Sequence, residues 1–143
     1  MTKLQAIRKF ADYVACEHVI IPKERTEWSM IMSDAHPRMT VPADLTLIDE
    51  NDRIFRNDFI QRCPLARGFA HVTLSILHEI GHHFNREVYI FSDIVEDENE
   101  TTEEHIKLPY EIVATNWAIE WLQDKENRKV AKAFERDFFR AVR

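Results

Sequence analysis

The sequence predicts a single α+β domain, residues 1–143, that is mostly helical and carries a short two- or three-stranded sheet. The length is that of one ordinary domain, and hydrophobic residues make up 45% of it, enough to form a core. Apolar residues recur at helical spacing in several separate segments. Two short apolar runs flanking a polar stretch favour strands instead.

Helices are predicted at 3–17, 68–84, 109–122 and 127–141. The first should end near Pro22, and Pro109 should begin the third, because a proline at the first helical position loses no helical hydrogen bond. The expected buried stripes are Leu4, Ile7, Phe10, Ala11 and Val14 in the first helix, Phe69, Val72, Ile76, Ile80 and Phe84 in the second, and Val130, Phe134 and Phe138 in the last.

The predicted sheet lies between the first two helices. Residues 45–48 and 53–56 are interpreted as two strands, and the polar residues 49–52 between them as a hairpin turn. Residues 23–42 are mixed, with a short helix or strand possible around Trp28 to Met32. Pro37 and Pro42 indicate turns.

The most specific motif is His78-Glu79-Ile80-Gly81-His82, an H-E-x-x-H run inside the second predicted helix. Residues four apart lie on one helical face, so His78 and His82 can bind one zinc ion at roughly 2.0–2.1 Å. Glu79 lies about 100° round the helix, where its carboxylate can take a proton from a water on the open side of the metal. The alternative is a helix that merely carries solvent-exposed histidines.

Gly81 is unusual because the chain contains only two glycines and one of them stands in mid-helix. A helical glycine costs roughly 1 kcal/mol relative to alanine. We therefore expect another backbone to approach Gly81 closely, although a helix that simply tolerates the glycine is the plainer alternative.

A catalytic zinc site needs a third protein ligand, and Glu111 is the candidate. It begins the helix predicted at 109–122, and Ala114 and Ala118 share its face, so this helix could pack closely against Gly81. From the residues alone, an acid that favours the helix dipole explains Glu111 equally well.

These two motifs together resemble the ImmA/IrrE metallopeptidases of phages, mobile elements and stress-response operons. That family carries H-E-L-G-H and, some 25–30 residues later, a helix reading roughly E-x-x-A-N-x-F-A-x-x-L-L. The second motif corresponds here to residues 111–122, with Thr115 at the usual Asn and Asn116 one place later. The positions that match directly are Glu111, Ala114, Ala118 and Leu122, whereas Trp117 and Trp121 replace other large apolar residues. Upstream, Ile54-Phe55-Arg56-Asn57 resembles the family's strand before the active helix.

The resemblance, which covers about residues 45–122, implies a zincin-like fold with the sheet beside the H-E-x-x-H helix and Glu111 as the third zinc ligand. It also implies a protein substrate, possibly a separate helix-turn-helix repressor. The substrate strand is expected along an exposed edge of residues 53–57.

The rival hypothesis is a catalytically inactive zincin-like protein that binds and antagonises a regulator. Glu79 argues against it, since a structural site needs no base.

Three more residues are candidates for supporting roles. His71, seven residues before His78, is expected to pack rather than to donate to the site. His105 and Tyr110 flank Glu111 and could stabilise an oxyanion, although a surface histidine and a core tyrosine are the plainer interpretations. His83 should point away from the face of the ligands.

Composition limits the partners. The net charge of −6, without a dense basic cluster, argues against direct nucleic-acid binding. With no apolar run of about 20 residues, no signal-like N-terminus and two isolated cysteines, we expect a cytoplasmic protein without membrane contact. Seven of the twelve residues 93–104 are acidic, which predicts a solvated loop or, alternatively, a lid that selects basic substrate segments.

Overall fold

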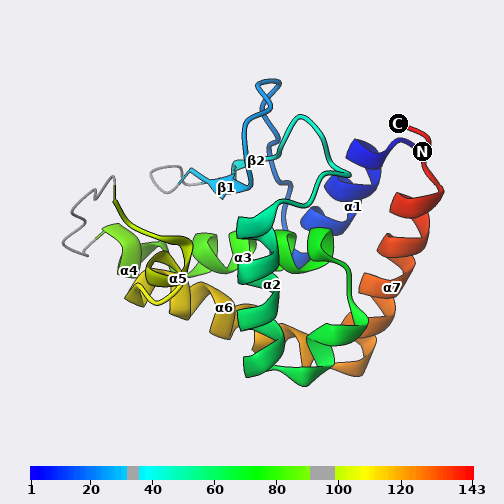
Figure 1. Cartoon of the computed structure of the whole chain (residues 1–143). Helices are drawn as coiled ribbons and strands as arrows, with labels where there is room; N and C mark the ends of the chain where they lie inside the picture. Colours follow the sequence, from blue (N-terminus) through cyan, green and yellow to red (C-terminus); the bar gives the residue numbers. More distant parts are fainter. Residues whose placement is uncertain (32–35, 91–98) are drawn as a thin grey trace.

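The computed structural model, which describes residues 1–31, 36–90 and 99–143, is mostly helical with one small antiparallel sheet (Figure 1). This confirms the coarse fold class that the sequence predicts. Among the described residues, no helix is long and apolar enough to cross a membrane. In chain order the elements are α1 (Lys3–Ala15), β1 (Ser29–Met30), β2 (Met39–Thr40), α2 (Glu50–Arg62), the 3-10 turn η1 (Pro64–Gly68), α3 (His71–Phe84), α4 (Arg86–Ile90), α5 (Thr102–His105), α6 (Pro109–Leu122) and α7 (Lys125–Arg140).

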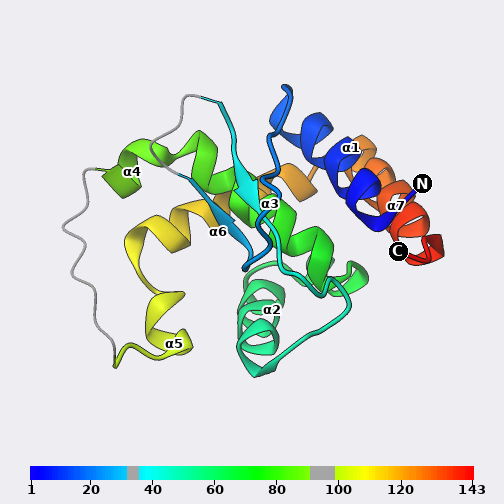
Figure 2. The ribbon, with the colours of Figure 1, turned by 90° about the horizontal axis from the view of Figure 1, so that it is seen from above.

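α3 is the central element, and every residue from His71 to His83 is buried. The other helices and the sheet surround it, with α6 packed along its length (Figures 1 and 2). A helix buried on all sides can hold polar side chains only if they are paired or hydrogen-bonded. The histidines and glutamate of the motif are therefore enclosed, and the interpretation of α3 as a helix with solvent-exposed histidines is wrong.

The N-terminus of α3 is capped from a distant part of the chain. Its N-cap residue is Ala70, which has no side chain to accept a hydrogen bond. Glu135 on α7 supplies the acceptor: its Oε2 receives hydrogen bonds from Ala70 N at 2.7 Å and from Thr73 Oγ1 at 2.5 Å. A carboxylate at this position also interacts favourably with the helix dipole.

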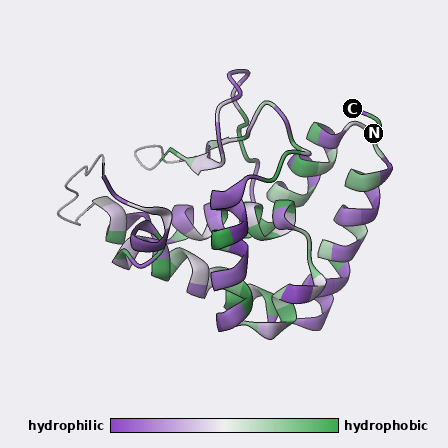
Figure 3. Ribbon diagram, in the orientation of Figure 1, coloured by the Kyte–Doolittle hydropathy of each residue, from purple (hydrophilic) through white to green (hydrophobic). Residues whose placement is uncertain are grey.

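α1 and α7 lie side by side at one end of the molecule (Figure 2). Their contact is aromatic, because the rings of Phe10 and Phe134 stack with centroids 4.6 Å apart. Trp121 of α6 meets Phe10 edge-on at 5.8 Å. Both helices alternate hydrophilic and apolar stretches (Figure 3), as amphipathic helices do. The predicted stripes of both helices are confirmed at Ile7, Phe10, Ala11 and Val14, and at Phe134 and Phe138, all of which are buried.

The contact between α3 and α6 depends on Gly81. A Cβ atom at this position would lie 2.5 Å from the carbonyl oxygen of Ala114 and 3.1 Å from its Cα. Such distances exclude any side chain unless the two helices move apart. The expected close approach at Gly81 is confirmed for Ala114, and both Ala114 and Ala118 are fully buried.

The sheet is present but is formed by residues other than those predicted. β1 and β2 pair with Ser29 opposite Thr40 and Met30 opposite Met39. Met39 is fully buried and Met30 nearly so, whereas the hydroxyls of Ser29 and Thr40 lie 2.5 Å apart. Of the two possibilities for the segment from Trp28 to Met32, a short helix or a strand, the strand is found at Ser29–Met30. Met32 lies outside the described residues.

The strands predicted at 45–48 and 53–56, with their hairpin turn, are wrong. Residues 50–62 form α2, and Asp49 and Asp52 form a capping box at its N-terminus rather than a hairpin turn. Leu47 and Ile48 are 65% and 44% exposed, so residues 45–48 do not build a core strand. Ile54-Phe55-Arg56-Asn57 lies within α2, so the resemblance of this segment to a strand of the family is also wrong.

Candidate metal centre

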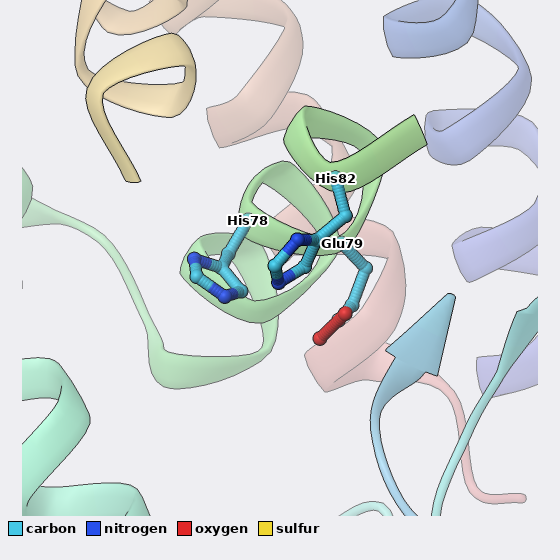
Figure 4. Close-up of side chains that lie close together, drawn as sticks. All are labelled: His78, Glu79 and His82. Carbon is cyan, nitrogen blue, oxygen red and sulfur yellow. The ribbon is translucent and has the colours of Figure 1, made fainter. Parts of the chain in front are cut away.

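α3 presents the two motif histidines to the same carboxylate. The rings of His78 and His82 have centroids 4.6 Å apart (Figure 4). Both Nε2 atoms point to Oε2 of Glu111, at 2.6 Å for His78 and 3.1 Å for His82. The helical spacing explains why both histidines lie on one face of α3, and the packing of α6 against Gly81 brings the carboxylate to them.

These three atoms are suited to a metal ion. Ligand atoms roughly 2.0–2.1 Å from a tetrahedral zinc lie about 3.3 Å from one another. The 3.1 Å between His82 Nε2 and Glu111 Oε2 is close to this spacing, whereas the 2.6 Å between His78 Nε2 and the same oxygen would lengthen when a metal enters. Without a metal, histidine N–H groups donating to Glu111 hold the same atoms together. All three residues are buried, so the candidate ligands are held by their surroundings.

Glu79 offers a second carboxylate beside the same histidines (Figure 4). One ligand atom from each of His78, Glu79 and His82 lies within 4.8 Å of the others, so this buried group could also hold a metal ion. Glu111 is the better third ligand, because its Oε2 already contacts both Nε2 atoms. Burial raises the pKa of Glu79, and the nearby Glu111 and Glu27 raise it further, against the lowering effect of His78 and His82.

The hydrogen bonds of Glu111 determine its charge. Burial alone would raise its pKa, but hydrogen bonds from His105, His78 and His82 hold that pKa far below the usual range. Burial conversely favours a lower pKa for His82, yet its hydrogen bond to Glu111 and the charges of Glu79 and Glu111 raise it overall. The site is therefore an anionic carboxylate held between imidazoles.

Two groups outside the ligand set orient these ligands. Thr115 Oγ1 lies 3.0 Å from His78 Nδ1, leaving Nε2 directed to Glu111. His105 Nε2 lies 2.9 Å from Glu111 Oε1, the oxygen that the ligand histidines do not contact. Outer hydrogen bonds of this kind fix the tautomer of a ligand histidine and the rotation of a ligand carboxylate.

A cavity of about 460 Å³ opens onto these residues. Its walls come from β1, α2, α3, α5 and α6, together with Tyr89 of α4. His78, Glu79, His82 and Glu111 all line it, so a substrate in the cavity would reach the buried ligands. Aromatic side chains contribute to the walls, among them Trp28, Phe55 and Tyr110.

His71 lines the cavity away from the ligands. Its Nε2 lies 3.1 Å from Ser75 Oγ and 3.3 Å from Asp52 Oδ1, and its ring packs edge-on against Phe55. Burial lowers the pKa of His71 more than Asp52 raises it. This arrangement agrees with the expected packing role.

His105 and Tyr110 both line the cavity. His105 is exposed, as the plainer expectation of a surface histidine has it, whereas Tyr110 is half-buried at the cavity wall rather than in the core. The ring centroid of Tyr110 lies 6.1 Å from that of His82, and burial together with Glu111 raises the pKa of its hydroxyl. His105 contacts Glu111 directly, and this hydrogen bond raises its pKa. His83 points away as expected, its Nε2 lying 3.8 Å from Glu17.

The sequence placed Thr115 at the family's usual Asn without assigning it a contact, and it did not identify Glu100. Thr115 stands four residues after Glu111 on one helical face, a spacing that could have indicated its role. Glu100 contacts His105 at 3.2 Å, and the sequence offers no signal for this pairing. Residues 93–98 of the predicted acidic loop or lid lie outside the described residues, whereas 102–105 form α5.

Comparisons of this chain with protein-family models, curated proteins and solved structures found no match.

Proposed function

We propose that this chain is a zinc-dependent endopeptidase with a small zincin-like fold, of the ImmA/IrrE type that its motifs resemble. The observation that carries the proposal is the convergence of His78 Nε2, His82 Nε2 and Glu111 Oε2 beside the buried carboxylate of Glu79. Two imidazoles and one carboxylate, reached from a cavity, are the donor set of a catalytic zinc site. Zinc, when bound, acidifies water and polarises a carbonyl group.

Glu79 is proposed as the general base. It lies next to the ligands without occupying the position of Glu111, and burial raises its pKa, which favours acceptance of a proton. It would accept a proton from the attacking water and return that proton to the leaving amine nitrogen. This role distinguishes a peptidase from the rival interaction protein, which has no use for a base.

The substrate backbone is proposed to lie along β1. Residues 53–57 cannot supply the strand edge expected there, because they are helical. β1 and the two residues before it, Glu27 to Met30, line the cavity that contains the ligands. An extended peptide running beside this strand would place a scissile carbonyl near the site. We propose a separate regulatory protein as the source of that peptide.

The metal content of purified protein tests the metal site. We expect about one zinc per chain in protein prepared without chelator, and loss of that zinc in His78→Ala and His82→Ala. Glu111→Ala should also weaken zinc binding. Metal analysis after gel filtration provides the readout, with His18→Ala as the control because His18 is three-quarters exposed outside the cavity. Full zinc affinity in Glu111→Ala would show that another residue is the third ligand.

A further inference from the structure

His105 links the candidate metal centre to the segment before it. Its two ring nitrogens both face carboxylates: Nε2 lies 2.9 Å from Glu111 Oε1, and Nδ1 lies 3.2 Å from Glu100 Oε1. His105 belongs to α5, whereas Glu111 belongs to α6. The histidine therefore reaches the carboxylate from a separate element, and its side chain is 46% exposed at the cavity.

The two oxygens of Glu111 have different partners. Oε2 lies within hydrogen-bond distance of the Nε2 atoms of His78 and His82, and Oε1 forms an ion pair with His105 Nε2 at 2.9 Å. A carboxylate held in this way can offer a metal one oxygen while the other remains hydrogen-bonded. Without His105 the carboxylate could rotate or use both oxygens, which would fill the open position that a catalytic site needs.

α5 is itself held in place. Thr101 Oγ1 caps it by accepting from Glu104 N at 3.2 Å, and Thr102 Oγ1 donates to Asn51 Oδ1 of α2 at 2.7 Å. Glu100 fixes the second nitrogen of the imidazole. His105 is thus anchored independently of the ligands, as a group that orients another side chain must be.

We infer that His105 is a positioning residue, which donates from Nε2 to Glu111 Oε1 and so directs Oε2 to the metal. This inference depends on the metal site proposed above. Outer-shell hydrogen bonds to metal ligands typically change metal affinity about 10–100-fold when they are removed. Loss of the His105 contact should therefore lower the zinc affinity, which can be measured without measuring catalytic activity.

The test is the zinc affinity of the full chain, measured by competition with a chromogenic chelator, for wild type, His105→Ala and His105→Gln. We expect His105→Ala to lose about tenfold or more in affinity. Glutamine keeps an N–H donor near the position of Nε2, so His105→Gln should recover most of the loss. His18→Ala is the matched control, because it removes a histidine that faces a carboxylate, Asp12, outside the cavity.

The melting temperature in excess chelator separates positioning from a general structural role. Positioning predicts little change in the metal-free melting temperature and a smaller rise on adding zinc. Wild-type zinc affinity in His105→Ala would overturn the inference, as would a His105→Gln variant that binds zinc no better than His105→Ala. Absence of zinc binding by the wild type would instead refute the proposed metal site, so the two failures are distinguishable.

Discussion

Glu111 shows how the environment of one residue decides its role. At the start of a helix it can be either an acid that favours the dipole or a metal ligand, and the sequence alone supports both equally. The structure brings its Oε2 within 3.1 Å or less of two imidazole nitrogens. That contact depends on how closely α6 approaches α3, which Gly81 and the small residues Ala114 and Ala118 indicate but Glu111 itself does not. The histidines, in contrast, were predictable because their spacing lies within a single helix.

Thr115 gives a prediction at this scale. When His78 binds a metal through Nε2, its Nδ1–H should donate to Thr115 Oγ1, 3.0 Å away. Thr115→Val keeps the shape of this buried side chain but removes the hydroxyl, so zinc affinity should fall about tenfold or more. Thr115→Ser retains the hydroxyl and should bind zinc nearly as wild type. Chelator competition measures both variants, and equal affinities for valine and serine would show that the hydroxyl has no influence on His78.

Among the elements, four of the long helices were predictable, whereas α2 and the sheet were not. α1, α3, α6 and α7 carry apolar residues at helical spacing or a proline at the first position, which are local signals. The run 45–48 has the composition of a strand, but no partner strand covers it and Leu47 stays exposed. The helix that includes 53–56 could have been predicted from two local signals. Asp49 and Asp52 have the spacing of a capping box, and Phe55 and Phe59 stand four residues apart, as on one helical face.

The contact between α3 and α6 can be tested through Gly81. In Gly81→Ala the new Cβ meets the backbone of Ala114, and overpacking of this kind costs about 1–3 kcal/mol, offset by up to about 1 kcal/mol of helix propensity. We expect a net loss of about 1–2 kcal/mol in the free energy of unfolding, with weaker zinc binding because Glu111 moves with α6.

Gly68→Ala is the matched control, because the nearest atom to its added Cβ is Lys132 Nζ at 3.9 Å. Urea unfolding of both variants in excess chelator, followed by circular dichroism, gives the comparison. Equal stability of the two alanine variants would show that the helices at Gly81 can separate without loss.

For the molecule as a whole, composition predicted a single mostly helical domain but left the partner undefined. The net charge of −6 makes a basic partner electrostatically favourable. Of the acidic residues 93–104, Glu103 and Glu104 are exposed on α5 beside the cavity, whereas Glu100 is turned toward His105.

Salt dependence tests the proposed partner. With zinc present, we expect chelator-sensitive cleavage of a helix-turn-helix repressor encoded near this chain, and slower cleavage as salt is added. Exposed charges are screened beyond roughly 8 Å at physiological ionic strength, so the attraction should weaken. Replacing Glu103 and Glu104 by Gln should slow cleavage at low salt only. Binding without cleavage by the zinc-loaded chain would favour the rival interaction protein.

The most direct test of a metal-dependent peptidase is a comparison of zinc-loaded wild type with zinc-loaded Glu79→Gln on one protein substrate, with cleavage followed by mass spectrometry. The amide keeps the size of the side chain but cannot accept the proton, and loss of a general base typically slows a reaction about 10²–10⁴-fold. We expect Glu79→Gln to bind zinc nearly normally and to lose cleavage to that extent, with chelator abolishing wild-type activity. Cleavage by Glu79→Gln at the wild-type rate would contradict the proposed mechanism.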